Sequence, residues 1–317
     1  MGFKIIPMEF KHQPVLVKEV LQYLAPQANE NFIDCTVGGG GHSEEILKFN
    51  GPKGKVLGID LDSQAIKAAG ENLKQFKDRI VLAKDNYKNI KKIAYDIPEF
   101  NHINGILLDL GLSSFELEDE TRGFSFRGSA FLDMRFGDSE KTAAYIINQY
   151  KEENLAKIFK IYGEERYAQQ IAREIVKERK LQPIRTTEQL VNIIENVYSH
   201  KPKPKIHVAT KVFQALRIEV NHELDNLQEV LPQAIDLLAK GGRLVVISFH
   251  SLEDRIVKDF LKNETRGCIC PPKLPVCNCN HKPSIKILTK KIIIPSLEEI
   301  KNNPRSRSAK LRAAIKI

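Results

Sequence analysis

Short apolar stretches alternate with amphipathic, helix-like stretches over the first third of the chain. The apolar stretches lie at residues 31–36, 56–60, 80–83 and 105–109. After Asp62, one helical face collects the apolar residues Ile66, Ala69, Leu73 and Phe76, a spacing that predicts a helix packed on a sheet. Strands that alternate with helices pair in parallel, so this region predicts an α/β sheet.

The alternation stops after Leu112 and resumes near the C-terminus. Residues 113–206 are charged and helix-periodic, with a capping box predicted at Thr186–Gln189. An apolar stretch returns at 241–248, and the segments 285–294 and 310–317 predict a hairpin that closes the sheet edge. We therefore expect a discontinuous sheet domain, residues 1–112 and 207–317, around a helical insertion, residues 113–206.

A run of four glycines, Gly38–Gly41, follows the first predicted strand. Glycine lets the backbone reverse sharply and approach a ligand, and a helix that begins near Ser43 directs its N-terminus to the same space. Asp60 ends the next strand about twenty residues further on, where an acidic side chain accepts hydrogen bonds from ribose hydroxyls. The pattern predicts a nucleoside site; the alternative is a glycine-rich turn that binds nothing.

The glycine pattern also restricts the class of ligand that the site is expected to bind. A dinucleotide fingerprint needs a third glycine where this chain has Ser43, which disfavours the rival interpretation, a nicotinamide oxidoreductase. The arrangement Asp34-x-x-x-Gly38-x-Gly40 instead resembles the first motif of Rossmann-like, S-adenosylmethionine-dependent methyltransferases. A carboxylate beside the loop suits a ligand that carries a sulfonium and an ammonium group.

Polar side chains follow the other predicted strands, and parallel strands bring their carboxyl ends to one crevice. We expect the Tyr87 ring to contact adenine, unless it is an ordinary half-buried aromatic residue. Asp109 is a candidate catalytic acceptor for the N–H groups of a target amine, or else only supports the cofactor. His250 is a second catalytic candidate, placed to touch a flipped base; alternatively His250 and Ser251 cap the next helix, with Ser251 as N-cap.

Charge and cysteine content restrict the class of protein. A net charge of +9 suggests a polyanionic partner. The sequence shows no signal peptide and no apolar run long enough to span a membrane, so we expect a cytoplasmic protein with no membrane partner. Five cysteines favour thiols or a metal site over a disulfide framework. Cys268, Cys270, Cys277 and Cys279 are candidate ligands of a structural zinc ion.

Several longer motifs carry a resemblance over nearly the whole chain. They lie at residues 12–19, 38–43, 105–114, 122–126, 132–135, 162–166, 213–217, 248–255 and 303–312. Together they resemble the bacterial small-subunit ribosomal RNA cytosine N4-methyltransferase family, also called MraW or RsmH. The resemblance implies a Rossmann-like methyltransferase fold and transfer of a methyl group from S-adenosylmethionine to N4 of a decoding-centre cytidine in 16S ribosomal RNA.

The resemblance also implies the cofactor contacts. On the matching positions these are Gly40, Gly41, His42, Asp60, Tyr87 and Asp109, to which the loop adds Gly38 and the segment after the paired serines adds Glu116. The family commonly has glutamine where this chain has Glu116, so the contact at that position is in question. Sequence leaves the oligomeric state open, a homodimer included.

The helical insertion and the basic C-terminal tail are the expected RNA contacts. The tail carries Lys301, Arg305, Arg307, Lys310, Arg312 and Lys316 without an acidic residue, and residues 201–205 add a second basic stretch. Three phenylalanines, Phe124, Phe126 and Phe131, lie among Arg122, Arg127 and Arg135, a mixture that suits an unpaired base and its phosphates. The alternatives are a solvated charged face and phenylalanines in the core. A non-catalytic RNA-binding assembly protein is the other function that these features fit.

Overall fold

The computed structural model describes residues 14–111, 121–126, 128–137, 139–202, 204–270 and 278–317. These residues form a seven-stranded sheet in the order β3-β2-β1-β4-β5-β7-β6. Its strands are β1 (Phe32–Asp34), β2 (Val56–Asp60), β3 (Ile80–Lys84), β4 (Ile103–Asp109), β5 (Leu238–Ser248), β6 (Ile285–Ile287) and β7 (Lys310–Lys316). Strands β1 to β5 pair in parallel, and β7 is antiparallel to both neighbours. This is the methyltransferase variant of the Rossmann-like topology, so the predicted fold class is confirmed.

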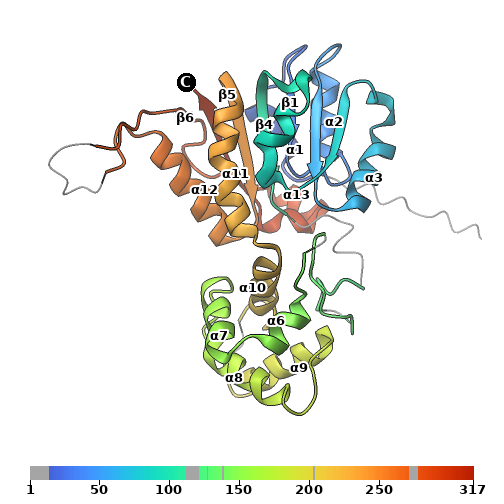
Figure 1. Ribbon diagram of the computed structural model, residues 1–317, viewed down its shortest axis with the longest axis vertical. Helices are drawn as coiled ribbons and strands as arrows, with labels where there is room; N and C mark the ends of the chain where they lie inside the picture. Colours follow the sequence, from blue (N-terminus) through green and yellow to red (C-terminus); the bar gives the residue numbers. More distant parts are fainter. Residues whose placement is uncertain (1–13, 112–120, 127, 138, 203, 271–277) are drawn as a thin grey trace, which may run out of the picture.

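Helices cover both faces of the sheet (Figure 1). Phe32 and Leu107 pack on the side of α1 (Val17–Leu24), α2 (Gly41–Phe49) and α3 (Ser63–Asn72). Their strand neighbours Ile33 and Leu108 pack on the side of α4 (Ile90–Tyr95), α11 (Glu223–Leu237) and α12 (Ser251–Glu264). Successive side chains of a strand point to opposite faces, which is why both faces of these continuously apolar strands are buried. Short 3-10 helices complete the connections at Lys74–Phe76, Tyr87–Asn89 (η2) and Pro98–Phe100.

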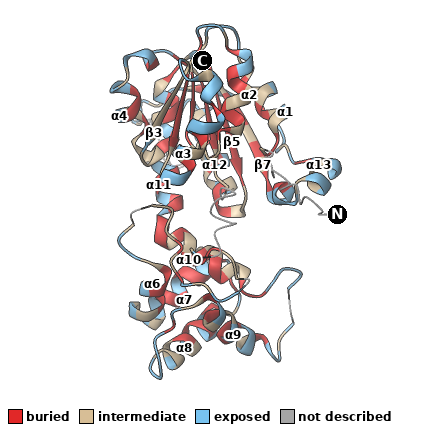
Figure 2. Ribbon diagram, turned by 90° about the vertical axis from the view of Figure 1, so that its right-hand side faces the viewer, coloured by how far each residue is buried: buried red, intermediate tan, exposed pale blue. Residues whose placement is uncertain are grey.

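A separate hydrophobic cluster lies beyond the carboxyl ends of the strands (Figures 1 and 2). It is built by α6 (Ala143–Gln149), α7 (Glu152–Ile161), α8 (Ala168–Glu178), α9 (Thr187–Tyr198) and α10 (Thr210–Asn221). The capping box is confirmed, because Thr186 Oγ1 accepts from Gln189 N and Gln189 Oε1 accepts from Thr186 N. The packed helices include α10, which follows the predicted end of the insertion at residue 206. The division into two domains remains a prediction.

Two ion pairs join the helical cluster and its connecting segment to the sheet. Arg122 Nη1 donates to Asp62 Oδ2 at 2.5 Å, directly before α3. Glu164 accepts from Ser251 Oγ at 2.9 Å and from Arg255 Nη2 at 3.1 Å, both on α12. These contacts fix the helices over the edge of the sheet at which β1, β2, β4 and β5 end.

The C-terminal segment completes the sheet. Strands β6 and β7 pair as the predicted hairpin does, but α13 (Leu297–Asn302) and the 3-10 helix Pro304–Ser308 lie between them. Strand β6 ends at Ile287, and the contact with β7 continues through hydrogen bonds of Leu288 and Thr289 to Ala313 and through the bridge of Ile293 to Leu311. None of the helices in the described ranges has the length and apolar character needed to cross a membrane.

Candidate functional site

The glycine loop after β1 has the backbone that the sequence predicts. Gly38 and Gly40 have φ values of 50° and 87°, a region that favours glycine. A Cβ atom on Gly41 would lie 2.5 Å from Cγ of Pro14, so a larger residue would force the chain apart there. Gly41 begins α2, whose N-terminal N–H groups therefore face the end of β1. At Gly38, by contrast, no atom lies nearer than 3.9 Å to the position of a Cβ atom, so a ligand can approach the backbone there.

Asp34 holds the loop from the end of β1. Its Oδ2 accepts from Ser43 Oγ at 2.7 Å, and its Oδ1 accepts from Thr36 N at 3.2 Å. Burial raises the pKa of Asp34 above its ordinary value, while the nearby His42 and Ser43 act against that rise. Ser43, which stands where a dinucleotide fingerprint has glycine, is thus a hydrogen-bond partner of the motif's acidic residue.

Asp60 contacts the loop directly. Its Oδ2 accepts from Gly38 N at 2.9 Å, and its Oδ1 accepts from Asp62 N at 2.9 Å. Burial is the main cause that raises the pKa of Asp60 to about 6. A carboxylate has about four acceptor positions, so two remain for a ligand. The carboxylate therefore shapes the loop and still has acceptor capacity on the side of the predicted ribose.

Asp109 and His42 meet between the ends of β4 and β1. His42 Nε2 lies 3.4 Å from Asp109 Oδ2, and Asp109 N donates to Thr36 Oγ1 at 2.7 Å. The side chains are 7% and 18% exposed. Within the described part of the chain, neither ring nitrogen of His42 nor Oδ1 of Asp109 makes a hydrogen bond. Buried polar atoms are nearly always paired, so these atoms fit a ligand that supplies donors at this point.

Tyr87 occupies the turn after β3, within η2. Its ring packs against the hydrophobic cluster of α4 and α11, and burial raises the pKa of its hydroxyl, with the negative charges of Glu223 and Glu253 adding to the rise. The half-buried packing foreseen as the alternative is therefore present. The contact with adenine remains a prediction, as does that of Glu116, which lies outside the described residues.

His250 is the N-cap of α12, which corrects the expectation that Ser251 caps this helix. His250 Nδ1 accepts from Glu253 N at 3.3 Å, and its Nε2 lies 3.0 Å from Glu253 Oε1. Glu253 Oε2 accepts from Phe249 N and His250 N, which completes a capping box. The accepting Nδ1 requires that the proton of the neutral ring sit on Nε2.

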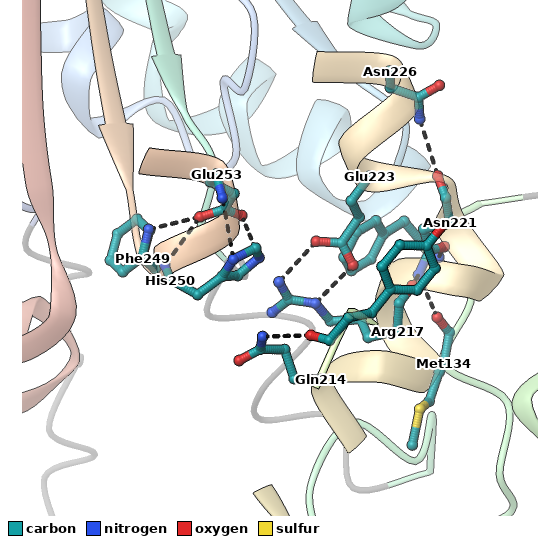
Figure 3. Close-up of polar contacts among 11 residues, drawn as sticks. Met134, Gln214, Arg217, Asn221, Glu223, Asn226, Phe249, His250 and Glu253 are labelled. Carbon is teal, nitrogen blue, oxygen red and sulfur yellow. Dashed lines mark hydrogen bonds and ion pairs between the residues drawn. The ribbon is translucent and has the colours of Figure 1, made fainter. Parts of the chain in front are cut away.

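A second buried pair faces His250 and Glu253, as Figure 3 shows. Arg217 donates to both carboxylate oxygens of Glu223 at 2.7 Å. Burial raises the pKa of Glu223 while Arg217 acts against the rise. Ligand-type atoms of Glu223, His250 and Glu253 lie within 4.8 Å of one another. The bidentate guanidinium already neutralises Glu223, so the group fits a charge network better than a metal site.

The sequence did not predict this network of Arg217, Glu223, His250 and Glu253. Arg217 stands in one of the motifs that carry the family resemblance, but Glu223 is an ordinary acid at the start of an amphipathic helix. The hydrogen bonds of Asn221 to Met134 O, of Asn226 to Asn221 O and of Gln214 to Tyr162 O surround the pair (Figure 3). The partners of Asn221 and Gln214 are far away along the chain, and no local spacing indicates them.

Several predicted RNA contacts have partners within the protein. Arg312 pairs with Asp254 through Nε at 2.7 Å and Nη2 at 3.2 Å. Lys316 donates to the carbonyl oxygens of Asp236 and Leu238. Phosphate binding by Arg312 and Lys316 is therefore disfavoured. Arg307 is exposed and Lys310 is half-buried, which leaves them accessible for a phosphate.

The prediction that Phe124, Phe126 and Phe131 contact RNA is partly wrong, because two of these rings pack within the protein. Phe124 is buried and stacks on Phe136 at 5.4 Å, and Phe126 stacks on His207 at 4.6 Å. These two phenylalanines have the core role that was the alternative, whereas Phe131 is 47% exposed. Arg135 pairs with Asp133, and Arg127 lies outside the described residues. Of the basic stretch at 201–205, Lys201 lies over the Tyr167 ring at 4.2 Å.

A cleft of about 310 Å³ opens beside the end of β5. Apolar side chains of Phe249, Ile294, Pro295 and Ile300 line it, together with His250, Ser251 and residues 307–310 of the tail. Arg307 and Lys310 give it positive charge, and its described lining contains no acidic residue. An apolar floor with basic residues suits a nucleotide whose base packs flat and whose phosphate needs a cation.

Comparisons with known proteins match nearly the whole chain to one family. The model of a family described as the MraW methylase family matches residues 9–317. A protein of Heliobacterium modesticaldum named "Ribosomal RNA small subunit methyltransferase H" is 48% identical over 312 residues, which cover 98% of this chain and 100% of that protein. A protein of Syntrophotalea carbinolica with the same name is 50% identical over 307 residues, 96% of this chain and 97% of that protein.

Proposed function

The chain belongs to the MraW methylase family, and on that premise we propose that it transfers a methyl group from S-adenosylmethionine to N4 of a decoding-centre cytidine in 16S ribosomal RNA. The observation that carries the proposal is the set of buried polar atoms of His42 and Asp109 that lack a hydrogen bond among the described residues, beside the glycine loop. The full-length relatives named as small-subunit ribosomal RNA methyltransferases support the RNA substrate.

The residues around the loop fit the cofactor. Gly38 leaves open space where a Cβ atom would lie, and Asp60 has acceptor positions left for two ribose hydroxyls. The carboxylates of Asp34 and Asp109 give the loop a negative environment that suits a ligand with ammonium and sulfonium charge. When bound, S-adenosylmethionine supplies a methyl group on a positively charged sulfur, which an amine attacks directly.

Asp109 is the proposed catalytic acceptor. The amine on a cytosine ring is a poor nucleophile because its lone pair is delocalised. A carboxylate oxygen that accepts one N–H of that amine holds the lone pair in line for attack and stabilises the positive charge that develops on nitrogen. Oδ1 of Asp109 has no partner within the described residues and is the atom we assign to this contact.

His250 takes a positioning role in this proposal. Nδ1 of its ring accepts from Glu253 N and Nε2 lies beside Glu253 Oε1, so the ring is a preorganised wall of the cleft at the end of β5. We assign the cleft to RNA near the target base, with Arg307 and Lys310 on phosphates. The base packs on the apolar side chains, chiefly Phe249 and Ile294.

The test uses small ribosomal subunits from cells that lack the gene. The purified chain is mixed with these subunits and isotopically labelled S-adenosylmethionine, and the RNA nucleosides are separated by mass spectrometry. We expect N4-methylcytidine at one site, and a rate lower by about 100-fold or more for Asp109→Asn, which keeps the shape but loses the charge. Asp259→Asn is the matched control, because Asp259 is 60% exposed on α12.

The outcomes of this experiment separate the competing functions. Methylation at cytosine C5 or on another base would contradict the N4 assignment but keep the methyltransferase. RNA binding without any transfer and without affinity for S-adenosylmethionine would instead indicate a non-catalytic assembly protein. Tight binding of a nicotinamide dinucleotide would favour the oxidoreductase.

A further inference from the structure

The cysteine-containing segment between α12 and β6 has no part in the proposed methyl transfer. Its sequence holds two Cys-x-Cys pairs, Cys268/Cys270 and Cys277/Cys279, separated by a proline-rich stretch. Cys277 lies outside the described residues. The other three are exposed or half-buried, so packing in a hydrophobic core does not account for their position.

The three described sulfur atoms converge. They lie within 4.8 Å of one another, and Sγ of Cys268 and Sγ of Cys279 are 3.8 Å apart. A disulfide needs about 2.0 Å between its sulfurs. In a tetrahedral zinc–thiolate site the Zn–S bonds of about 2.3 Å place neighbouring sulfurs about 3.8 Å apart. The observed contact is a hydrogen bond between two thiols, and its length matches the separation of two ligands of one metal ion.

Hydrogen bonds hold the three sulfur atoms in place, since Sγ of Cys270 donates to Asn278 Oδ1 at 3.4 Å and Sγ of Cys279 donates to Sγ of Cys268. Cys270 N donates to Sγ of Cys268 at 3.4 Å, a contact that stabilises negative charge on sulfur. The base of the segment is closed independently, because Ser284 N donates to Glu264 O and His281 Nε2 contacts Asn263 O. The cysteines thus gather above a fixed base, on a part of the chain that has few apolar contacts of its own.

We propose that Cys268, Cys270 and Cys279 bind a structural zinc ion. Soft thiolate ligands in this number select zinc over the hard cations magnesium and calcium. The segment precedes β6, the edge strand of the sheet. The ion therefore shapes the segment and takes no part in chemistry at the ends of β1 and β4.

The experiment measures zinc in the full-length chain, purified with a reducing agent. We expect about one zinc ion per chain in the wild type. Cys268→Ser and Cys279→Ser should each lower zinc affinity by more than about 100-fold, since loss of an outer-shell partner alone costs 10- to 100-fold. Cys35→Ala is the matched control, because Cys35 is buried at the end of β1 and should leave the zinc content unchanged.

Replacing zinc with cobalt(II) identifies the ligands, because cobalt bound to sulfur absorbs light characteristically. Cobalt(II) in the wild type should give strong sulfur-to-metal charge-transfer absorption, which weakens in each serine variant, and Cys270→Ser should weaken it to the same degree. The proposal is overturned if the reduced wild type binds no more zinc than Cys268→Ser, or if both serine variants keep their zinc. It is also overturned if the native chain holds these cysteines as disulfides. None of these results depends on methyl transfer.

Discussion

Arg122 joins the segment before Phe124 to the turn after β2, and replacing it with methionine separates the two. Its Nη1 donates to Asp62 Oδ2 at 2.5 Å, and its Nη2 donates to the carbonyl oxygens of Arg135 and Phe136 at 2.7 and 3.1 Å. Asp62 is 6% exposed and Arg122 is 18% exposed. The substitution therefore leaves a nearly buried carboxylate and two carbonyl groups without their cationic donor.

The size of the stability loss depends on the hydrogen bonds that remain after Arg122 is replaced. Removing one partner of a buried pair costs about 3–5 kcal/mol. Asp62 still accepts from Gln64 N as the N-cap of α3, and water reaches the partly exposed site, so the loss is reduced. We expect Arg122→Met to lower the free energy of unfolding by about 2–4 kcal/mol. Arg122→Lys keeps the charge but lacks the planar fork, so its stability should fall between those of the wild type and Arg122→Met.

The effect should also reach the cofactor site. Asp62 N donates to Asp60 Oδ1, and Asp60 Oδ2 holds Gly38 N, so the ion pair stands two contacts away from the glycine loop. We expect Arg122→Met to weaken S-adenosylmethionine binding about tenfold, roughly 1.4 kcal/mol. Chemical denaturation and calorimetry measure the two quantities. A double-mutant cycle with Asp62→Asn isolates the pair, because the amide oxygen still caps α3.

One result would refute this reasoning. If folded Arg122→Met binds the cofactor with wild-type affinity, the segment and the loop are not coupled through Asp62, even if stability falls. Arg185→Met is the matched control for loss of an exposed arginine and should change neither quantity. A coupling energy near zero in the cycle would show that the cost comes from the carbonyl groups of Arg135 and Phe136.

The remaining predictions concern the site and the tail. Asp60→Ala should weaken S-adenosylmethionine binding by about 1–3 kcal/mol, because the ribose hydroxyls lose a charged acceptor; unchanged calorimetric affinity in a folded variant would remove Asp60 from the site. With a pKa of about 6, Asp60 is ionised above that pH, so cofactor affinity should fall as the pH drops through 6, and Asp60→Asn should flatten this part of the profile. Asp109→Ala should reduce the single-turnover rate more than RNA affinity; a normal rate with poor cofactor binding would restrict Asp109 to the cofactor. Arg307→Gln with Lys310→Gln should weaken RNA binding and lower the salt slope by about 0.7 to 0.9 for each phosphate that the protein no longer neutralises, whereas Arg312→Gln should cost stability by breaking its pair with Asp254. An unaltered salt slope in the folded double variant would move the RNA footprint away from the cleft.

The sheet was predictable because its strands are buried on both faces. Such strands appear as continuous apolar runs, and β2 has the predicted bounds. Strand β1 is shorter than the apolar run, since the chain leaves the sheet after Asp34 to enter the glycine loop. Asp60 and Asp109 could also be placed, because a carboxylate that ends a parallel strand has only one edge of the sheet to face.

The basic tail shows what a charge pattern cannot reveal. Arg307 and Arg312 look equivalent in sequence, but one is exposed on a 3-10 helix and the other lies on β7 opposite Asp254 of α12. Pairing depends on which element packs against each residue, and the packing of α12 on β7 is a tertiary contact. A basic run therefore predicts attraction to polyanions as a whole and does not indicate which cations remain available for them.

The His250 network also depends on tertiary packing that the sequence does not reveal. Within the sequence, His250 and Glu253 are three residues apart, which is the spacing of a capping box, yet histidine is an unusual N-cap and Ser251 is the more typical choice. Glu253 makes the difference, because it accepts from the backbone at Phe249 and His250 while it faces the ring. The cap therefore fixes the imidazole at the end of β5, beside Arg217 and Glu223 from the helical side. Movement of α10 against the sheet would therefore disturb this charge arrangement as well as the ion pairs Arg122–Asp62 and Glu164–Arg255.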